Sequence, residues 1–122
     1  MRSILFSIIL FVQTALGSAI AGEADVVNAK ARKTGNDVWR ISVTVLHDDE
    51  GWDHFANKWD VVDPEGNIIA TRVLAHPHEN EQPFTRLLGG VKIDPSITEV
   101  TIRAHDSVHG YGGKEFLLSL KK

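Results

Sequence analysis

The feature that most constrains this chain is an alternation of apolar and polar residues at 39–45, within a predicted strand at about 38–46. Trp39, Ile41, Val43 and Val45 fall on one face of this segment, and polar residues fall on the other. A period of two is typical of a β-strand with one buried face. Similar short runs, separated by turn-forming residues, occur at about 25–33, 58–63, 68–75, 84–93, 97–105 and 115–121. Seven short strands in about 100 residues predict an all-β, immunoglobulin-like β-sandwich, with an open barrel as the alternative.

The first 21 residues have a different character. A short positive start precedes an apolar run at 4–12, and Ala19-Ile20-Ala21 supplies the small residues of a cleavage site. This layout is typical of a secretory signal peptide, and the run is short for a membrane span. We therefore expect cleavage before Gly22, a single domain at 22–122, and no membrane span in the mature chain. An uncleaved N-terminal anchor is the alternative.

Composition narrows the chemistry that the chain can carry. The formal net charge is −3, with 13 basic and 16 acidic residues, which argues against nucleic acid as a partner because phosphates require basic clusters. There is no cysteine, so neither a disulfide nor a bacterial lipoprotein anchor is expected. The one methionine, Met1, lies in the expected leader. A metal site in the mature chain would therefore use nitrogen and oxygen ligands.

The positions of the histidines point to one end of the predicted sandwich. If each strand reverses the direction of the one before it, the loops after the second, fourth and sixth strands lie at the same end. These loops are long and polar, whereas the other three turns are short. Rigid sandwiches commonly carry binding residues on such loops. The six histidines all fall in or next to this set: His47, His54, His76, His78, His105 and His109.

The strongest local signal among them is His76-Pro77-His78. Proline favours an extended backbone before it, and residues two apart in an extended chain point the same way, so both imidazoles could reach one ion. We rank His105 next and His109 fourth. His47 and His54 rank lower, since His47 continues the inward phase of its strand and could merely cap the core. The competing interpretation is that the histidines pack against or hydrogen-bond the loops. Carboxylates of the same loops could be ligands or could orient an imidazole: Asp48, Asp49, Asp53, Glu79, Glu81 and Asp106.

Ligands of this kind favour Zn(II), Cu(II) or Ni(II) over Cu(I), and the acidic run at 48–51 does not match a calcium loop. Ser107 lies beside Asp106 and near His109, but no nucleophile elbow is present, so we expect no enzyme activity. Our leading prediction is a periplasmic, non-enzymatic protein that binds Zn(II) or Cu(II). Two alternatives are a module that docks a periplasmic protein through exposed aromatic residues, and a pH sensor based on histidine titration. The aromatic residues in question are Trp52, Phe55 and Tyr111.

Three segments carry a resemblance to a known group of proteins: DHFANKWDVVDP (53–64), HPHENEQPFTR (76–86) and RAHDSVHGYGGKEF (103–116). They resemble a family of small secreted bacterial proteins without an assigned role, over nearly the whole mature chain. The resemblance implies a Gram-negative periplasmic setting and an immunoglobulin-like fold, and it carries over no functional residues. In outline the chain is also similar to small periplasmic copper-carrier sandwiches. It departs from them because it has no methionine-rich loop and no histidine at the expected mature N-terminus.

Overall fold

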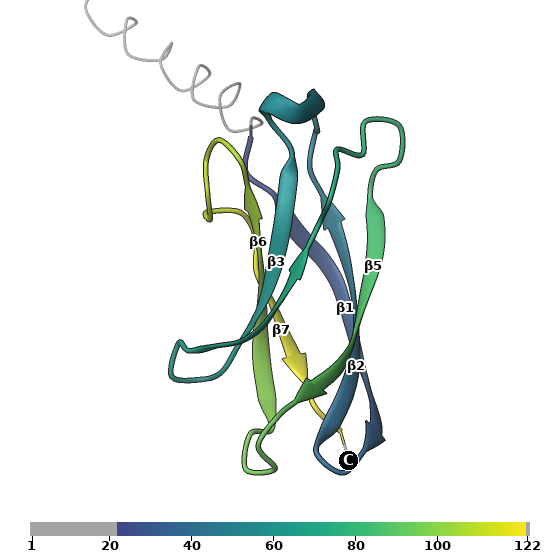
Figure 1. The fold of residues 1–122 in the computed structure, drawn as a ribbon. Helices are drawn as coiled ribbons and strands as arrows, with labels where there is room; N and C mark the ends of the chain where they lie inside the picture. The colour runs from purple at the N-terminus through teal and green to yellow at the C-terminus, as the bar shows by residue number, and fades with distance from the viewer. Residues whose placement is uncertain (1–21, 122) are drawn as a thin grey trace, which may run out of the picture.

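The computed structural model describes residues 22–121, which form two antiparallel β-sheets facing each other (Figure 1). The predicted signal peptide lies outside the described residues. One sheet has the strand order β1-β2-β5 and the other the order β4-β3-β6-β7. The strands are β1 (Asp25–Gly35), β2 (Val38–Leu46), β3 (Ala56–Val62), β4 (Ile68–Val73), β5 (Phe84–Lys92), β6 (Glu99–Asp106) and β7 (Phe116–Ser119). The predicted all-β class and the seven strands are confirmed; the immunoglobulin-like assignment stays a prediction.

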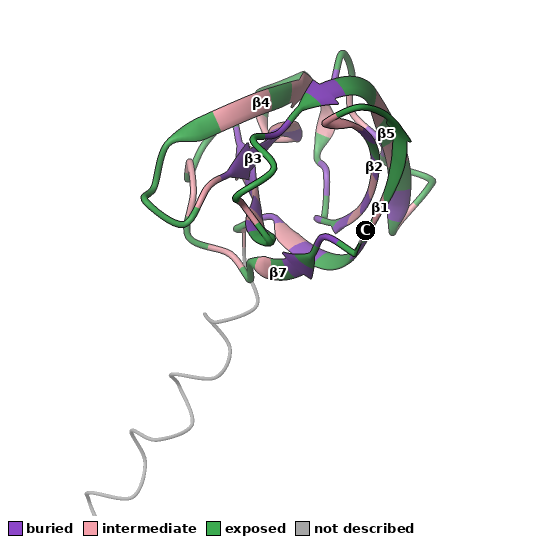
Figure 2. Ribbon diagram, turned by 90° about the horizontal axis from the view of Figure 1, so that it is seen from below, coloured by how far each residue is buried: buried purple, intermediate pink, exposed green. Residues whose placement is uncertain are grey.

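The core lies between the two sheets and follows the alternation in the sequence. Ile41 and Val43 of β2 are fully buried, and so are Trp59 of β3 and Ile102 of β6 from the facing sheet. Figure 2 shows the two sheets enclosing this interior, with the buried segments distributed over both. The core positions predicted for Trp39 and Trp59 are confirmed, and Trp52 is 68% exposed, as expected.

A β-bulge adjusts β5 to the curvature of its sheet. Trp39 pairs with Val91 and Ile41 pairs with Leu88, so three steps along β5 oppose two steps along β2. The extra residue falls at Gly89-Gly90, and Gly90 has φ +65°, a conformation that glycine adopts without strain.

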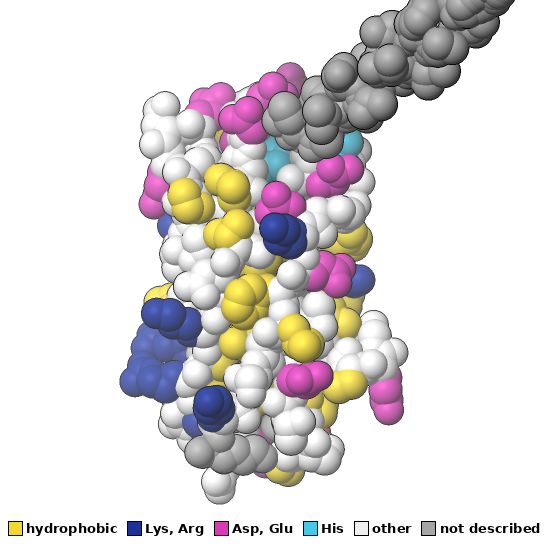
Figure 3. Space-filling view, turned by 180° about the vertical axis from the view of Figure 1, so that it is seen from behind, with side chains coloured by type: hydrophobic (Ala, Val, Ile, Leu, Met, Phe, Trp, Pro, Cys, Tyr) yellow, Lys and Arg dark blue, Asp and Glu magenta, His cyan; other side chains and the backbone are white. Residues whose placement is uncertain are grey.

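The loops after β2, β4 and β6 lie together at the upper end of the molecule in Figure 1. We call this end, made of residues 47–55, 74–83 and 107–115, the histidine end. A 3-10 helix, η2 (Gly51–Asp53), lies in the first of these loops. Figure 3 shows histidine and acidic side chains at this end, with lysine and arginine gathered lower on the same face. The expectation that these three loops share one end is confirmed.

Candidate metal site at the histidine end

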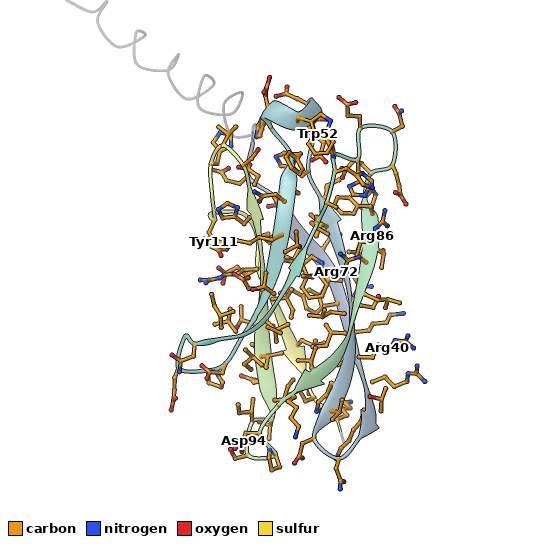
Figure 4. The ribbon with its side chains drawn as sticks, in the orientation of Figure 1. Arg40, Trp52, Arg72, Arg86, Asp94 and Tyr111 are labelled. Atoms are coloured by element: carbon orange, nitrogen blue, oxygen red, sulfur yellow. The ribbon has the colours of Figure 1, made fainter. Side chains whose placement is uncertain are left out.

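Hydrogen bonds tie the three loops of the histidine end to one another. The backbone N–H of His47 donates to Gln82 Oε1 at 3.0 Å, which joins the first loop to the second. The backbone N–H of His78 donates to Asp49 Oδ2 at 2.7 Å across the same junction. The N–H of Ser107 donates to the carbonyl of Phe55 at 2.9 Å and joins the third loop to the first. Side chains on the three loops are therefore held at fixed separations, with their ends grouped at the top of the sandwich (Figure 4).

Two histidines and one aspartate converge at the centre of this end. His47 directly follows β2, His54 follows η2, and Asp106 is the last residue of β6. The Nε2 atoms of His47 and His54 lie 3.3 Å apart, and they lie 3.1 and 3.2 Å from Asp106 Oδ2. His47 and Asp106 are buried, whereas His54 is half-buried. We call these three residues the central cluster; among residues 22–121 they form the group of three metal-ligating side chains able to reach one ion.

A second carboxylate stands behind each imidazole of the cluster. Asp49 Oδ1 lies 2.5 Å from His47 Nδ1, and Glu50 Oε1 lies 3.0 Å from His54 Nδ1. A carboxylate in this position accepts the Nδ1 proton and leaves the lone pair of a neutral imidazole on Nε2. Asp49 is itself held, because Oδ1 accepts the N–H of Ala56 at 3.1 Å and Oδ2 accepts the N–H of His78. When both imidazoles are neutral and carry their proton on Nδ1, both Nε2 lone pairs point into the cluster.

This arrangement brings the lone pairs of the two Nε2 atoms and of the Asp106 carboxylate close together. The two Nε2 atoms face Asp106 Oδ2, and the carbonyl oxygen of Gly22 lies 2.8 Å from His47 Nε2. Neutral imidazoles cannot donate from Nε2 when Nδ1 already carries the proton. The contacts are favourable only when a positive species sits among them, either an added proton on an imidazole or a metal ion. The cluster could therefore hold either a protonated imidazole or a bound metal ion.

The spacing of the three atoms fits a small transition-metal ion. Bonds of about 2.0–2.1 Å to a tetrahedral ion separate neighbouring ligand atoms by roughly 3.3 Å. The three edges of the cluster measure 3.1, 3.2 and 3.3 Å. Carboxylates that hydrogen-bond the far nitrogen of ligating imidazoles are also a regular feature of metal sites. The side chains are already spaced as such an ion requires.

The charge of the cluster is fixed by its hydrogen bonds. Burial raises the pKa of the Asp106 carboxyl, but hydrogen bonds from the backbone and imidazole of His109, from His54 and from the N–H of Val108 outweigh burial and lower the pKa to about 2. Burial lowers the pKa of His54, but its hydrogen bonds with Glu50 and Asp106 outweigh burial and raise that pKa above 6.5. Asp106 is therefore an anion at neutral pH, and it attracts a cation.

His109 lies at the rim of the central cluster. Its Nδ1 is 3.1 Å from Asp106 Oδ2, and its ring centroid is 4.9 Å from that of His54. The backbone N–H of His109 also donates to Asp106 Oδ1, so the loop after β6 turns back over its own carboxylate. His109 is exposed, which places it between the cluster and solvent. It is a further imidazole available to an ion held by the cluster.

The pair predicted to be strongest, His76 and His78, lies together but makes other contacts. The His78 ring stacks on Phe84 with 4.0 Å between centroids, and its Nε2 lies 2.8 Å from a guanidinium nitrogen of Arg86. Because a guanidinium only donates, that bond occupies the Nε2 lone pair. Burial and the nearby charges of Arg86 and His76 lower the pKa of His78. His76 is exposed, and its Nδ1 lies 3.0 Å from the carbonyl of Pro77.

His105 also lies outside the central cluster. Its Nδ1 is 2.7 Å from Asn57 Oδ1, and its ring meets Tyr111 edge-on at 4.8 Å. The Tyr111 hydroxyl donates to buried Asp60 at 2.6 Å, and Arg103 lies over the Tyr111 ring. These contacts hold the loop after β6 against the four-stranded sheet. The order expected from the sequence, with His76, His78 and His105 first, therefore differs from the arrangement found, in which His47 and His54 are central.

The side chain of Ser107, which was considered from the sequence as a nucleophile, hydrogen-bonds the backbone of the first loop. Its Oγ accepts the N–H of Phe55 at 3.0 Å and donates to the carbonyl of Asp53 at 3.5 Å. The imidazole of nearby His109 contacts Asp106. Ser107 thus joins the third loop to the first.

Comparison with known proteins places the chain beside one relative. It is 36% identical over 96 residues to a protein of Halomicrobium mukohataei named "Putative lipoprotein". The match covers 79% of this chain but 47% of that protein, so the chain spans about half the length of its relative. No family model matches the sequence, and no solved structure matches it. Among the described residues, no helix has the length and apolar character needed to cross a membrane.

Proposed function

We propose that this protein is an exported, non-enzymatic binding protein for a divalent transition metal, Zn(II) or Cu(II), held by His47, His54 and Asp106. The observation that carries the proposal is the convergence of two imidazole Nε2 atoms and one carboxylate oxygen at 3.1–3.3 Å. Their geometry favours a bound cation. The outer carboxylates Asp49 and Glu50 hydrogen-bond Nδ1 of the two imidazoles and so orient the Nε2 lone pairs toward it. His109 and the Gly22 carbonyl are further donors within reach.

The ligand chemistry supports these two ions over others. Imidazole nitrogen with carboxylate oxygen suits Zn(II) and Cu(II), whereas Cu(I) prefers sulfur ligands. The chain has no cysteine, and its one methionine is Met1. Ca(II) and Mg(II) take oxygen ligands, whereas two of the three central atoms are nitrogens. The nitrogen and oxygen ligands of the site thus favour Zn(II) and Cu(II) over Cu(I), Ca(II) and Mg(II).

The surroundings of the cluster favour binding over catalysis. A pocket of about 230 Å³ adjoins His47, lined by residues that include Gly22, Glu23 and Gln82. Sites for small-molecule substrates are commonly about 300–1,000 Å³. The neighbouring space is small for an organic substrate, while an ion needs no more than the cluster itself.

Export is supported by two independent observations. The first 21 residues have the layout of a signal peptide. The relative from Halomicrobium mukohataei is named as a lipoprotein, a class of exported protein. We assign the mature chain to the periplasm, where it would meet metal ions outside the cytoplasm.

Calorimetric titration of the tag-free, metal-stripped mature chain with ZnCl2 and with CuSO4 tests the proposal. We expect one ion per chain with submicromolar affinity, and a loss of at least tenfold in a His54→Ala variant. His76→Ala is the matched control, because it removes an exposed histidine of the same end that is not in the cluster. Affinity lost in His76→Ala and kept in His54→Ala would place the ion elsewhere and reject this assignment.

A second candidate function is docking of a periplasmic protein at the histidine end. Trp52 is 68% exposed and meets Phe55 edge-on at 5.6 Å, and neighbouring Val108 is 58% exposed. Exposed tryptophans are frequent centres of protein interfaces. Of the three aromatic residues considered from the sequence, Tyr111 is engaged with Asp60 and Arg103 instead. Site-specific photocrosslinking from position 52 in cells, beside position 65 at the opposite end, would give a discrete adduct at position 52 alone if the surface docks a partner.

We also assign the fold to the immunoglobulin-like sandwiches. Seven antiparallel strands in two facing sheets support this assignment, as does the passage of the chain between sheets after β2, β4 and β5. An experimental structure in which β1 pairs with β7 or β4 pairs with β5, closing the sheets into one barrel, would overturn it.

A further inference from the structure

The backbone of Gly22 lies directly against the central cluster. Its carbonyl oxygen is 2.8 Å from His47 Nε2, on the side of the imidazole that faces Asp106. The residue has φ +101°, which L side chains rarely adopt. A Cβ built on Gly22 would lie 2.2–2.7 Å from ring atoms of His109. With glycine at position 22, the backbone lies against His109 without displacing its imidazole.

Gly22 is also the residue that the cleavage-site pattern makes the first of the mature chain. Ala19-Ile20-Ala21 supplies the small residues that a signal peptidase requires, and cleavage after Ala21 converts the amide nitrogen of Gly22 into a free α-amine. The amine and the carbonyl oxygen of one glycine can bind the same ion as a five-membered chelate ring. An amide nitrogen in an uncleaved chain offers no lone pair for this purpose.

We propose that removal of the signal peptide completes the metal site, with the α-amine and carbonyl oxygen of Gly22 joining His47, His54 and Asp106 around the ion. This inference rests on the proposed function and adds to it: metal binding becomes a property of the processed chain. The uncleaved precursor, which lacks the amine, holds the ion only through its side chains. The amine must be deprotonated to bind, and because an α-amine has an ordinary pKa of about 7.7–8.0, the ion has to displace its proton at neutral pH.

The contacts also show what a side chain at position 22 would displace. A side chain there would collide with the His109 imidazole and push it away from Asp106, from which its Nδ1 is 3.1 Å. The next residue does not share this restriction, because Glu23 is exposed. Gly22 is therefore a positioning residue for His109 as well as a source of two ligand atoms.

The experiment compares three forms of the mature chain that differ only at the N-terminus. The first begins at Gly22, the second carries one additional residue, Ala21, and the third begins at Gly22 with its α-amine acetylated. Each is titrated with CuSO4 by calorimetry, and the Cu(II) complex is recorded by visible absorption and electron paramagnetic resonance. We expect the form that begins with a free Gly22 amine to bind at least tenfold more tightly than the other two. Its absorption band should lie at shorter wavelength, as an added nitrogen ligand requires.

The outcomes separate this inference from the proposal on which it rests. If all three forms bind with the same affinity and the same spectra, the side-chain site stands and the role of the amine is rejected. If none binds, the proposed function fails. If the acetylated and extended forms bind weakly but the free-amine form binds tightly, both stand. Glu65→Ala serves as the matched control in the free-amine background, because Glu65 is an exposed carboxylate at the opposite end of the molecule, and it should leave the spectra unchanged.

Discussion

Replacement of Asp106 by asparagine tests the electrostatics of the central cluster without any metal. The substitution preserves the shape of the side chain and keeps an oxygen that can accept the N–H groups of Val108 and His109. It removes the negative charge at Oδ2, the atom that the Nε2 atoms of His47 and His54 approach. Any change in stability therefore reports the interaction of that charge with the backbone N–H groups of His109 and Val108 and with the surrounding imidazoles.

The expected size of the effect follows from the pKa of Asp106. Folding lowers this pKa from 3.8 to about 2. Each unit of pKa shift corresponds to about 1.4 kcal/mol, so the folded protein favours the charged carboxylate by about 2 kcal/mol. For a domain of about 100 residues, a loss of that size lowers Tm by roughly 10 °C.

The dependence on pH has a definite sign at both ends. Because the folded pKa of Asp106 is lowered, its stabilisation is complete above pH 3.8 and is lost as pH falls through about 2. Because the folded pKa of His54 is raised, the stabilisation from its charged form is complete below pH 6.5 and is lost as pH rises through the raised value. Above that value the asparagine amide can donate to a neutral Nε2. The difference between wild type and Asp106→Asn should therefore be largest between about pH 4 and 6.5.

Urea denaturation of both proteins in EDTA, from pH 3 to 8, measures this difference as a change in midpoint at constant slope. Asp53→Asn is the matched control, since Asp53 is an exposed carboxylate in the same loop as His54. Its effect should stay within about 0.5 kcal/mol, as is usual for surface substitutions. A difference for Asp106→Asn that is constant from pH 4 to 8, or that increases toward pH 8, would refute the assignment of a charged Asp106 beside a titrating His54.

Three further predictions concern the metal and the core. Zn(II) affinity should fall steadily as pH drops through the raised pKa of His54, because protons then compete with Zn(II) for its Nε2. A Zn(II) affinity that calorimetry finds unchanged from pH 8 to 5.5 would contradict this. Glu50→Gln should weaken Zn(II) binding by about tenfold, because Glu50 orients the His54 ring. The free energy of unfolding should change little, since Glu50 is exposed. Equal Zn(II) affinity in the two proteins would show that the outer carboxylate has no role. Trp59→Ala should lower the free energy of unfolding by about 3–5 kcal/mol, because Trp59 is buried in the core. Trp52→Ala should change it by less than about 0.5 kcal/mol, because Trp52 is exposed. Urea midpoints measure both changes, and similar losses in the two variants would contradict the core assignment.

The strands could be predicted from the sequence because the β period of two is visible in each. In β2 the buried positions are those that the alternation indicates, and the bulge in β5 occurs at its paired glycines. Directions of consecutive strands follow from short turns, so the common end of the three long loops could also be predicted. The sheet order could not, because the pairing of β2 with β5 and of β3 with β6 depends on contacts between segments distant in sequence.

For a related reason, the ranking of the histidines does not anticipate which of them lie in the central cluster. His76 and His78 do lie side by side, as the extended His-Pro-His segment predicts, with their ring centroids 4.6 Å apart. The local sequence does not show that His78 binds two residues at the start of β5. Arg86 hydrogen-bonds its Nε2, and Phe84 stacks on its ring. The partners of a loop side chain come from other loops, and local spacing carries no information about them.

The central residues nevertheless had a signal in the strand pattern. His47 continues the inward phase of Val43 and Val45, and Asp106 continues that of Ile102 and Ala104. A polar group that extends a buried row must find hydrogen-bonding partners, because an unpaired polar atom in the interior costs about 1–3 kcal/mol. When two neighbouring loops each place such a group at the same end of a core, the groups are each other's nearest available partners. An imidazole and a carboxylate brought together in this way, one from each sheet, form the start of a cation site. The buried phase of a strand, followed one residue past its end, is therefore a better guide to this site than the density of histidines in the loops.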